Sequence, residues 1–191
     1  TATGSNLRND MIIICHSFFT EEGYLIINES PVIGIALTAC LYLAVGTGSM
    51  EIRSKDPKIQ PYLDYNFLQE SLDVDRMREG VFKSMELGES VEFKDIIEKR
   101  VDPTDEDLES DASIDLWMKR KVITSHHVSG TCKMGPSSDN MAVVDQYGRV
   151  YGLDGLRVVD ASIMPDCIRA NTNVTTMVIG ERIADFIKNG R

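Results

Sequence analysis

Apolar residues alternate with mostly small residues over 31–45, the longest apolar run of the chain. A period of two is typical of a β-strand that buries one of its faces. The run is also shorter than the roughly 20 residues that a membrane-spanning helix needs. We therefore predict a strand and no membrane span, with a buried face made of Ile33, Ile35, Leu37, Leu41, Leu43 and Val45.

Two shorter apolar segments, 11–15 and 24–28, come before this run. An acidic turn at 21–23 separates them, and this arrangement predicts hairpins. Further along, two prolines exclude a continuous helix over 48–68. The first part of the chain is therefore expected to form a largely antiparallel sheet.

Helical spacing of apolar residues follows the predicted sheet. The first helix is expected over 73–87, with Asp73 as its N-cap. A second helix is expected to begin at Thr104, which forms a capping pair with Asp107. It ends in the basic run 119–121, whose charge suits the negative end of a helix dipole.

The pattern changes near residue 123, where charged helix gives way to short strand-like pieces divided by glycines. A last helix is predicted over 174–188, with a buried stripe of Ile179, Ile183, Phe186 and Ile187. The shift in composition is the one boundary that the sequence supports. We therefore divide the chain into residues 1–122 and residues 123–191.

Composition narrows the classes of function. The chain has 191 residues, 42% of them hydrophobic, with a formal net charge of -10 and a pI near 4.8. Binding to nucleic acid requires clustered Lys and Arg, and the longest basic run is 119–121. We therefore expect no nucleic-acid partner.

The cysteines and the opening residues add little to this picture. The four cysteines are far apart in the sequence and form no CxxC pair, so we interpret them as reduced thiols and not as metal ligands. Residues 1–10 lack the basic start and the apolar run of a signal peptide. We expect no metal site.

Three segments carry the chemistry: SHHVSGTCKMG at 125–135, GLRVVDASIMP at 155–165 and NTNVTTMVIGERIADFI at 171–187. Together they resemble the C-terminal portion of the glucose-methanol-choline (GMC) oxidoreductases, with a choline dehydrogenase-like pattern. The resemblance implies an FAD-dependent oxidation of a small-molecule alcohol. It also exposes an absence, because such enzymes hold the ADP part of FAD in a GxGxxG turn, and this chain has none.

Weaker matches extend the resemblance toward the N-terminus. The Ser-x-Asp-Pro element at 54–57 is similar to part of the family's substrate domain. The segment GSNLRND at 4–10 resembles a GxNLxDH element, with Met11 where the family usually has histidine. The resemblance thus implies an α+β fold, in which residues 1–122 form a mostly antiparallel substrate-binding domain with flanking helices. Residues 123–191 would be the catalytic segment that completes an FAD-binding α/β domain, whose N-terminal dinucleotide-binding part lies elsewhere.

The expected catalytic base is a histidine. Oxidation of an alcohol by hydride transfer requires the hydroxyl proton to leave, and an imidazole suits this task near neutral pH. In the family the base stands three residues before the glycine of the GTC-like turn, which selects His127. His126 and His16 are interpreted as structural residues. A lone histidine is often structural, and the three matching segments favour the catalytic interpretation of His127.

The resemblance places a second catalytic residue, His or Asn in the family, just before the last helix. Here it is Asn171, whose amide could hydrogen-bond the substrate oxygen without taking its proton. Asparagine also favours the N-cap of a helix, a role that we assign to Asn173. By resemblance, Thr172, Asn173 and Val174 are expected to contact the flavin, because the positive end of the helix would face its pyrimidine ring.

Asp160 ends an apolar segment, where polar residues of open sheets often contact ligands. A simple turn aspartate is an equal alternative from the sequence alone. The family places the matching Asp-Ala-Ser against the ribityl and diphosphate part of FAD, so we expect Asp160 and Ala161 to bind the cofactor. Cys132 and Met134 are interpreted as packing residues.

Two other functions stay open at this point. The chain could act alone as a binding or interaction module that keeps the fold without redox chemistry, because it lacks the GxGxxG turn. It could also belong to a lyase, because some members of the family cleave cyanohydrins on the same scaffold. The hypothesis that the resemblance favours is the C-terminal part of an FAD-dependent alcohol dehydrogenase or oxidase.

Overall fold

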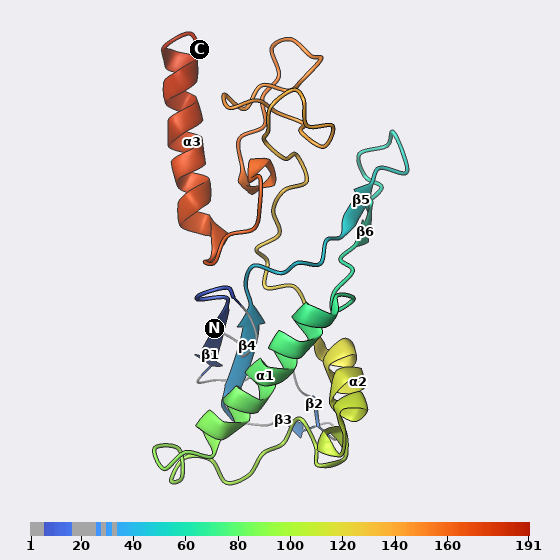
Figure 1. The fold of residues 1–191 in the computed structure, drawn as a ribbon, viewed down its shortest axis with the longest axis vertical. Helices are drawn as coiled ribbons and strands as arrows, with labels where there is room; N and C mark the ends of the chain where they lie inside the picture. The colour runs from blue at the N-terminus through green and yellow to red at the C-terminus, as the bar shows by residue number, and fades with distance from the viewer. Residues whose placement is uncertain (1–5, 17–25, 28–29, 32–33) are drawn as a thin grey trace. The chain divides into compact units, whose positions relative to one another are not determined.

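The computed structural model describes residues 6–16, 26–27, 30–31 and 34–191. Its contacts divide the chain into two compact units (Figure 1). The first consists of Thr1–Gly46 and Phe67–Val122, and the second of Thr47–Asn66 and Ile123–Arg191. The sequence placed residues 47–66 with the first part of the chain, whereas their contacts group them with the second.

The first unit is built on an antiparallel pair of strands. Strand β1 (Met11–His16) pairs with β4 (Ala36–Leu41), with Met11 opposite Leu41. A second, two-residue pair joins β2 (Ile26–Ile27) to β3 (Ser30–Pro31). Helix α1 (Ser71–Gly88) lies against β1 and β4 (Figure 1). The predicted antiparallel arrangement is confirmed for the described strands.

Gly80 allows α1 to approach the strands closely. A Cβ atom at this position would lie 2.3 Å from Cε of Met11 and 3.1 Å from Cβ of Ala39. Both distances are shorter than an ordinary carbon–carbon contact of roughly 3.5–4.0 Å. The helix could therefore not carry a larger residue here without moving away from the sheet.

The strand predicted over 31–45 is shorter in the structure. It ends at Leu41, because Leu43 adopts a φ of 52° and the carbonyl groups of Tyr42 and Leu43 accept hydrogen bonds from Arg76. Val45 is 48% exposed, so its predicted place on a buried face is wrong. Ile33 lies outside the described residues. After Leu41 one more backbone hydrogen bond follows, from the N–H of Tyr42 to the carbonyl of Asp10 at 2.7 Å, and an ion-pair cluster then holds the chain.

Asp73 belongs to that cluster and is not the N-cap of α1, as the sequence had predicted. The helix begins at Ser71, and the carboxylate of Asp73 accepts the backbone N–H groups of Val45 and Gly46 at 2.8–3.1 Å. Arg76 contacts Asp73 at 2.5 Å and Asp10 at 3.2 Å. All three charged side chains are nearly inaccessible to solvent.

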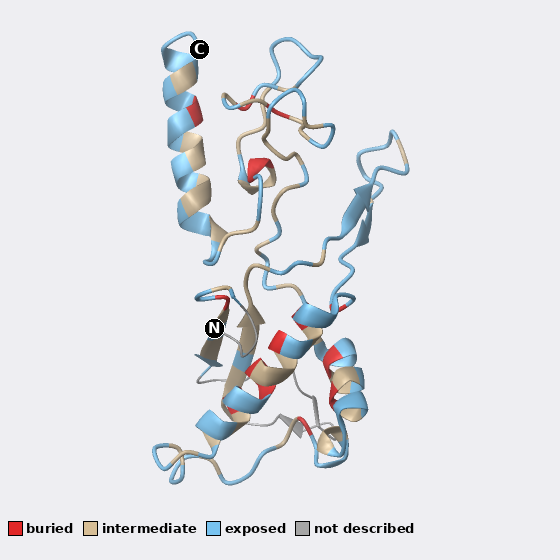
Figure 2. Ribbon diagram, viewed as in Figure 1, coloured by how far each residue is buried: buried red, intermediate tan, exposed pale blue. Residues whose placement is uncertain are grey.

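The core of the first unit lies between α1 and α2 (Asp111–Lys121) (Figure 2). Four buried apolar residues form it, namely Leu68, Val81, Ile114 and Met118. Ser110 caps α2 by accepting the N–H of Ser113 at 3.1 Å. The predicted basic end of the helix is confirmed, because residues 119–121 form its last turn.

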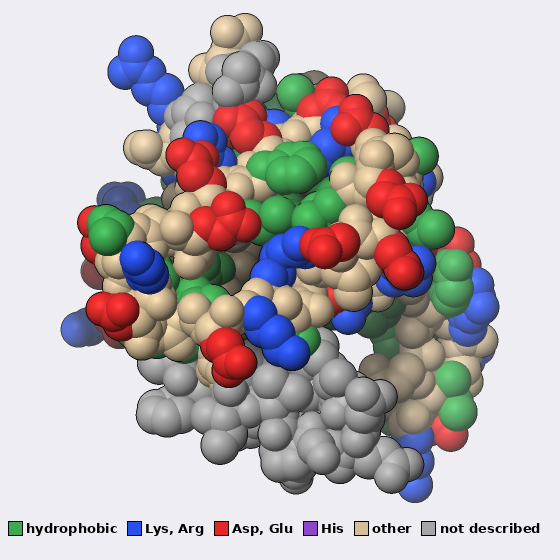
Figure 3. Space-filling model, turned by 90° about the horizontal axis from the view of Figure 1, so that it is seen from below, with side chains coloured by type: hydrophobic (Ala, Val, Ile, Leu, Met, Phe, Trp, Pro, Cys, Tyr) green, Lys and Arg blue, Asp and Glu red, His purple; other side chains and the backbone are tan. Residues whose placement is uncertain are grey.

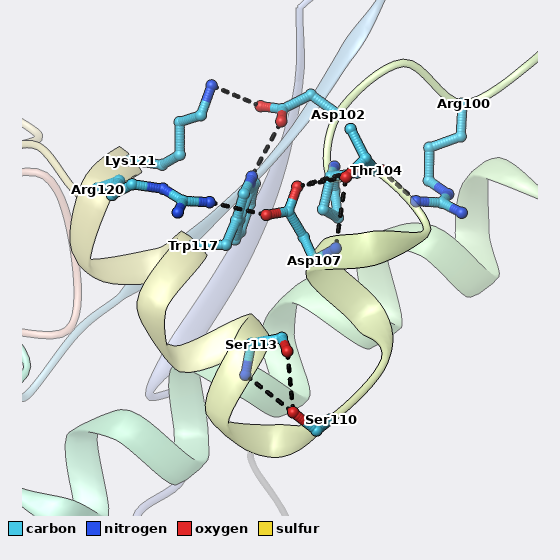
Figure 4. A network of polar contacts seen from close by, with 10 residues as sticks. Arg100, Asp102, Thr104, Asp107, Ser110, Ser113, Trp117, Arg120 and Lys121 are labelled. Atoms are coloured by element: carbon cyan, nitrogen blue, oxygen red, sulfur yellow. Dashed lines mark hydrogen bonds and ion pairs between the residues drawn. The ribbon is translucent and has the colours of Figure 1, made fainter.

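A polar network connects α2 with the segment that precedes it (Figure 4). Thr104 and Asp107 form the predicted reciprocal pair of hydrogen bonds. They open the 3-10 turn η1 (Glu106–Leu108) and not the helix itself, so the predicted start of the helix is wrong. The indole N–H of Trp117 donates to Asp102 at 2.9 Å. Arg120 pairs with Asp107 at 2.7 Å and so connects the last turn of α2 to η1.

The second unit contains a hairpin, loops held by isolated bridges, and a helix. Strands β5 (Ser49–Glu51) and β6 (Tyr62–Asp64) pair antiparallel, while η2 (Ala161–Ile163) and α3 (Thr172–Lys188) lie in the C-terminal segment. The strand-like pieces predicted at 140–160 appear only as single bridges, such as Val144 with Val150. Their glycines do adopt the positive φ of turns, at Gly148, Gly152 and Gly155.

The surface carries charges of both signs. On the face of the molecule in Figure 3, acidic and basic side chains are interspersed, with hydrophobic side chains between them. Local ion pairs account for part of this pattern, for example Arg78 with Asp75 and Asp115. Within the described part of the chain, no helix combines the length and hydrophobicity that crossing a membrane demands.

Candidate active site

The GTC turn is attached through its backbone to the segment of η2. The N–H of Gly130 donates to the carbonyl of Ala161 at 3.3 Å, and the N–H of Cys132 donates to that of Ser162 at 2.9 Å. Gly130 adopts a φ of 83°, which a residue with a side chain avoids. Two of the three motifs found in the sequence are therefore held side by side.

The structure brings His127 into contact with the start of α3. Its Nδ1 atom lies 3.1 Å from the hydroxyl Oγ1 of Thr172. The backbone N–H of Thr172 also points to Nδ1, with a nitrogen–nitrogen distance of 3.5 Å. Both side chains are half-buried. The first and the third motif therefore meet at one histidine, the residue selected from the sequence.

The neighbouring histidine is placed differently. His126 is exposed and adopts a φ of 63°, and its backbone N–H donates to Oγ1 of Thr124 at 3.0 Å. His16 is exposed at the end of β1. The contact with α3 thus distinguishes His127 from both of the other histidines.

Asn171 occupies the N-cap position of α3, with an extended backbone and no capping hydrogen bond from its side chain. The N-cap predicted at Asn173 is wrong, because the helix begins two residues earlier than expected and Asn173 lies in its first turn. Asn171 directly precedes Thr172, the partner of His127. The chain therefore places both predicted catalytic residues at the N-terminal end of one helix.

The N-terminal end of α3 offers free hydrogen-bond donors. The first N–H groups of a helix have no partner within the helix. Those of Asn173 and Val174 find no acceptor among the residues that the structure describes. Both side chains are exposed, Val174 at 66%. Helix α3 has 17 residues, and its positive end lies beside His127. This end also carries the two N–H donors without a described partner.

Asp160 caps η2. Its Oδ1 accepts the N–H of Ser162 at 2.8 Å and the hydroxyl of the same residue at 2.5 Å. The role of a turn aspartate, one of the two alternatives from the sequence, is therefore present. Its second oxygen, Oδ2, accepts no hydrogen bond within the described ranges, so the carboxylate could also bind a ligand. The carbonyl of Ala161 accepts a hydrogen bond from the N–H of Gly130.

An apolar cavity of about 350 Å³ lies between η2, the loop that follows it and α3. Met134, Ile163, Cys167 and Ile179 are among the residues that line it. His127 does not line it. None of the predicted catalytic or cofactor-binding residues lines this cavity, so it is distinct from the candidate site.

Two further contacts hold the GTC segment and helix α3 in place. Lys133 of the GTC segment pairs with Asp139 at 2.8 Å, and this hydrogen bond lowers the pKa of the Asp139 carboxyl. Tyr147 packs edge-on against Phe186 of α3, with ring centroids 5.0 Å apart. No sequence motif marked these contacts. In the described part of the chain, no group of three or more His, Cys, Asp or Glu side chains could hold a metal ion.

The chain is similar to known proteins in sequence and in structure. A family model described as GMC oxidoreductase matches residues 44–180. The oxygen-dependent choline dehydrogenase of Klebsiella pneumoniae is 40% identical over 141 residues, which are 74% of this chain and 25% of that protein. Oxygen-dependent choline dehydrogenase 1 of Chromohalobacter salexigens is 35% identical over 145 residues, 76% of this chain and 26% of that protein.

Solved structures give the same result. Pyridoxine 4-oxidase from Mesorbium loti aligns with a TM-score of 0.80 and 29% identity, covering 92% of this chain and 34% of that one. A formate oxidase variant of Aspergillus oryzae, studied for FAD modification, also has a TM-score of 0.80, with 26% identity over 95% of this chain and 32% of its own. The chain thus spans only about a quarter to a third of these relatives. The match of one family over most of its length shows that the chain belongs to the GMC oxidoreductases.

Proposed function

We propose that this chain is the C-terminal part of an FAD-dependent oxidoreductase that oxidises the CH–OH group of a small alcohol. The observation that carries the proposal is the contact between His127 and the first residue of α3, directly after Asn171. An imidazole and an amide at one helix end can take a hydroxyl proton and hold the substrate oxygen. The choline dehydrogenases among the relatives make choline the first alcohol to test.

The free donors at the start of α3 fit FAD. The unpaired N–H groups of Asn173 and Val174 suit an anionic ring or phosphate, and the helix dipole adds a favourable potential. Asp160 would hold a hydroxyl of the ribityl chain through Oδ2, beside Ala161. When bound, FAD supplies the acceptor of the hydride. Thr172, Asn173, Val174, Asp160 and Ala161 thus remain the proposed contacts of the cofactor.

His127 and Asn171 would divide the remaining work. Nε2 of His127 would take the hydroxyl proton, while Nδ1 faces Thr172. The amide of Asn171 would donate to the substrate oxygen as negative charge develops on it. The imidazole is half-buried, so its orientation depends on packing and on its contact with the side chain of Thr172.

The rest of the enzyme would supply what this chain lacks. The matched region covers only 25% of the Klebsiella relative. We propose that the remaining polypeptide holds the ADP part of FAD and packs on the second unit, so that residues 123–191 complete the FAD-binding domain. The apolar cavity beside α3 and the exposed Val174, Met177 and Val178 on the helix give it an apolar surface.

Replacement of His127 by glutamine in the intact flavoprotein tests this proposal. We expect the rate at which choline reduces the bound flavin to fall by about 10²- to 10⁴-fold, because general-base catalysis is lost. Rapid mixing without oxygen, followed by flavin absorbance, measures this rate. His126→Gln is the matched control and should keep the wild-type rate.

Two outcomes would contradict the proposal. Equal rates for His127→Gln and His126→Gln would remove His127 from the chemistry. Failure of the wild-type protein to reduce its flavin with choline, pyridoxine or an aryl alcohol would argue against alcohol oxidation itself. Release of a carbonyl product while the flavin stays oxidised would indicate a lyase.

A further inference from the structure

Thr172 presents two different groups to Nδ1 of His127. The hydroxyl Oγ1 lies at 3.1 Å, an ordinary hydrogen-bond distance. The backbone nitrogen lies at 3.5 Å, the outer limit of such a bond. The hydroxyl can donate or accept a proton, whereas the backbone N–H can only donate. The backbone N–H therefore favours an unprotonated Nδ1, whereas the hydroxyl is compatible with either protonation state.

The choice between these states decides whether His127 can be a base. A neutral imidazole carries its proton on one nitrogen, and the other nitrogen accepts. If Nδ1 carries the proton, it donates to Oγ1 of Thr172, and Nε2 is free to take a proton from an alcohol. If Nε2 carries the proton, it cannot take another, and Nδ1 merely accepts from Thr172. Among the contacts of His127 with described residues, only the hydroxyl of Thr172 can accept the Nδ1 proton and so hold the productive form.

We propose that Thr172 is a positioning residue whose hydroxyl accepts the Nδ1–H of His127 and thereby leaves Nε2 unprotonated as the base. This inference rests on the proposed function and assigns Thr172 a role that differs from a flavin contact. In the reaction the O–H bond of the alcohol breaks and its proton forms a bond with Nε2. The hydride leaves the carbon with its electron pair for the flavin, the oxidant. The resulting imidazolium still donates from Nδ1 to the same hydroxyl.

The local structure holds this hydroxyl in place. Thr172 is the first residue of α3 and is half-buried. Its carbonyl accepts the hydroxyl of Thr176 at 2.8 Å within the same helix. A β-branched side chain also has few accessible rotamers in a helix. The helix itself is anchored by Ile183, which is 3% exposed. Thr172 can thus hold the imidazole at little cost in side-chain entropy.

Three variants of the intact flavoprotein separate this role from packing. Thr172→Val keeps the shape and removes the hydroxyl, Thr172→Ser keeps the hydroxyl, and Thr176→Val removes a hydroxyl one turn further along the helix. With choline as the probe, we expect Thr172→Val to lower the limiting rate of flavin reduction about 10- to 100-fold, as for other groups that orient a functional histidine. The half-saturating choline concentration should change less than about 3-fold, because binding is retained. Thr172→Ser should recover most of the rate, and Thr176→Val should keep it.

A spectroscopic measurement tests the inference without activity. With ¹⁵N-labelled histidine, the ring nitrogen shifts report which nitrogen carries the proton, and His127→Gln identifies the signal. We expect the proton on Nδ1 in the wild type and in Thr172→Ser, and on Nε2 in Thr172→Val. A wild-type proton on Nε2, or equal shifts and rates for Thr172→Val and Thr176→Val, would overturn the inference. If no alcohol reduces the wild-type flavin, the proposed function fails, and the ring shifts still decide the role of Thr172.

Discussion

At the scale of single residues, the carboxylate of Asp145 holds the turn that it forms with Tyr147 and Arg149. Its Oδ1 accepts the backbone N–H groups of Tyr147 and Arg149 at 2.9 and 3.0 Å, and its Oδ2 accepts Nε of Arg149 at 2.7 Å. Tyr147 then packs on Phe186 of α3. Asp145 therefore stabilises the turn on which the helix rests.

The charge of Asp145 predicts a dependence of stability on pH. Burial acts to raise the pKa of this carboxyl, but the hydrogen bonds from Arg149 and Tyr147 outweigh it and lower the pKa. A lowered pKa contributes stability in full above the unfolded value of about 4, and this contribution is lost as the pH falls through the folded value. We expect Asp145→Asn to reduce the free energy of unfolding by about 1–2 kcal/mol at pH 7. The difference should shrink below about pH 4 in urea titrations.

Asp154→Asn provides the control for this prediction. Asp154 is exposed in the following turn and accepts no hydrogen bond from the described residues. Its replacement should leave the free energy of unfolding within about 0.5 kcal/mol of the wild type. A difference between Asp145→Asn and the wild type that stays constant from pH 7 to pH 3 would contradict the electrostatic explanation.

At the scale of elements, Arg76 joins three parts of the first unit. Its guanidinium contacts Asp10 before β1, the carbonyls of Tyr42 and Leu43 after β4, and Asp73 of α1. The side chains of Arg76 and Asp10 are 1% and 0% exposed. Removal of one member of such a buried pair leaves an uncompensated charge. The cluster therefore couples the strand ends to the helix.

We expect Arg76→Met to lower the free energy of unfolding by about 3–5 kcal/mol, because Asp10 and Asp73 would both stay buried without their cation. Urea denaturation measures this loss. Lys83→Met on the same helix is the control, since Lys83 is 59% exposed and solvent screens its pair with Glu86. If Arg76→Met were no less stable than Lys83→Met, the cluster would not be what couples these elements.

The elements that the sequence predicted best are those set by local patterns. Helix α3 ends at Lys188 as expected, and its stripe of Ile179, Ile183 and Phe186 is at least partly buried. Ile187 was wrong, because it is 56% exposed in the last turn of the helix, although it lies on the same face as the buried Ile183. The start was also wrong by two residues, since asparagine fills the N-cap equally well at either position.

Tertiary contacts explain what the patterns missed. The alternation over 31–45 predicted a longer strand, but Arg76 binds the carbonyls that follow Leu41 and ends the pairing there. In the site, counting along a motif selected His127 as the base; the structure places this histidine against α3, and its catalytic role stays a prediction. No local pattern indicated that the hydroxyl of Thr172 faces this ring, because the two residues are 45 positions apart.

At the scale of the whole molecule, the chain presents an apolar surface that its own described residues leave uncovered. Val174, Met177 and Val178 follow one side of α3 at helical spacing, with 55–66% of each residue exposed. Soluble proteins rarely leave such a stripe open unless another surface covers it. The proposed partner is the remaining part of the polypeptide, because the chain spans about a quarter of its relatives.

Met177→Glu in the intact protein tests this docking surface. A carboxylate buried against apolar atoms costs several kcal/mol, so we expect a lower melting temperature and a loss of bound FAD on purification. Met141→Glu is the matched control, because Met141 is 73% exposed in a turn. It should retain the flavin and the melting temperature of the wild type. Full flavin content in both variants would mean that this side of α3 faces solvent in the enzyme. Loss in Met177→Glu alone would support the proposal that this side of α3 packs against the remaining, cofactor-holding part of the polypeptide.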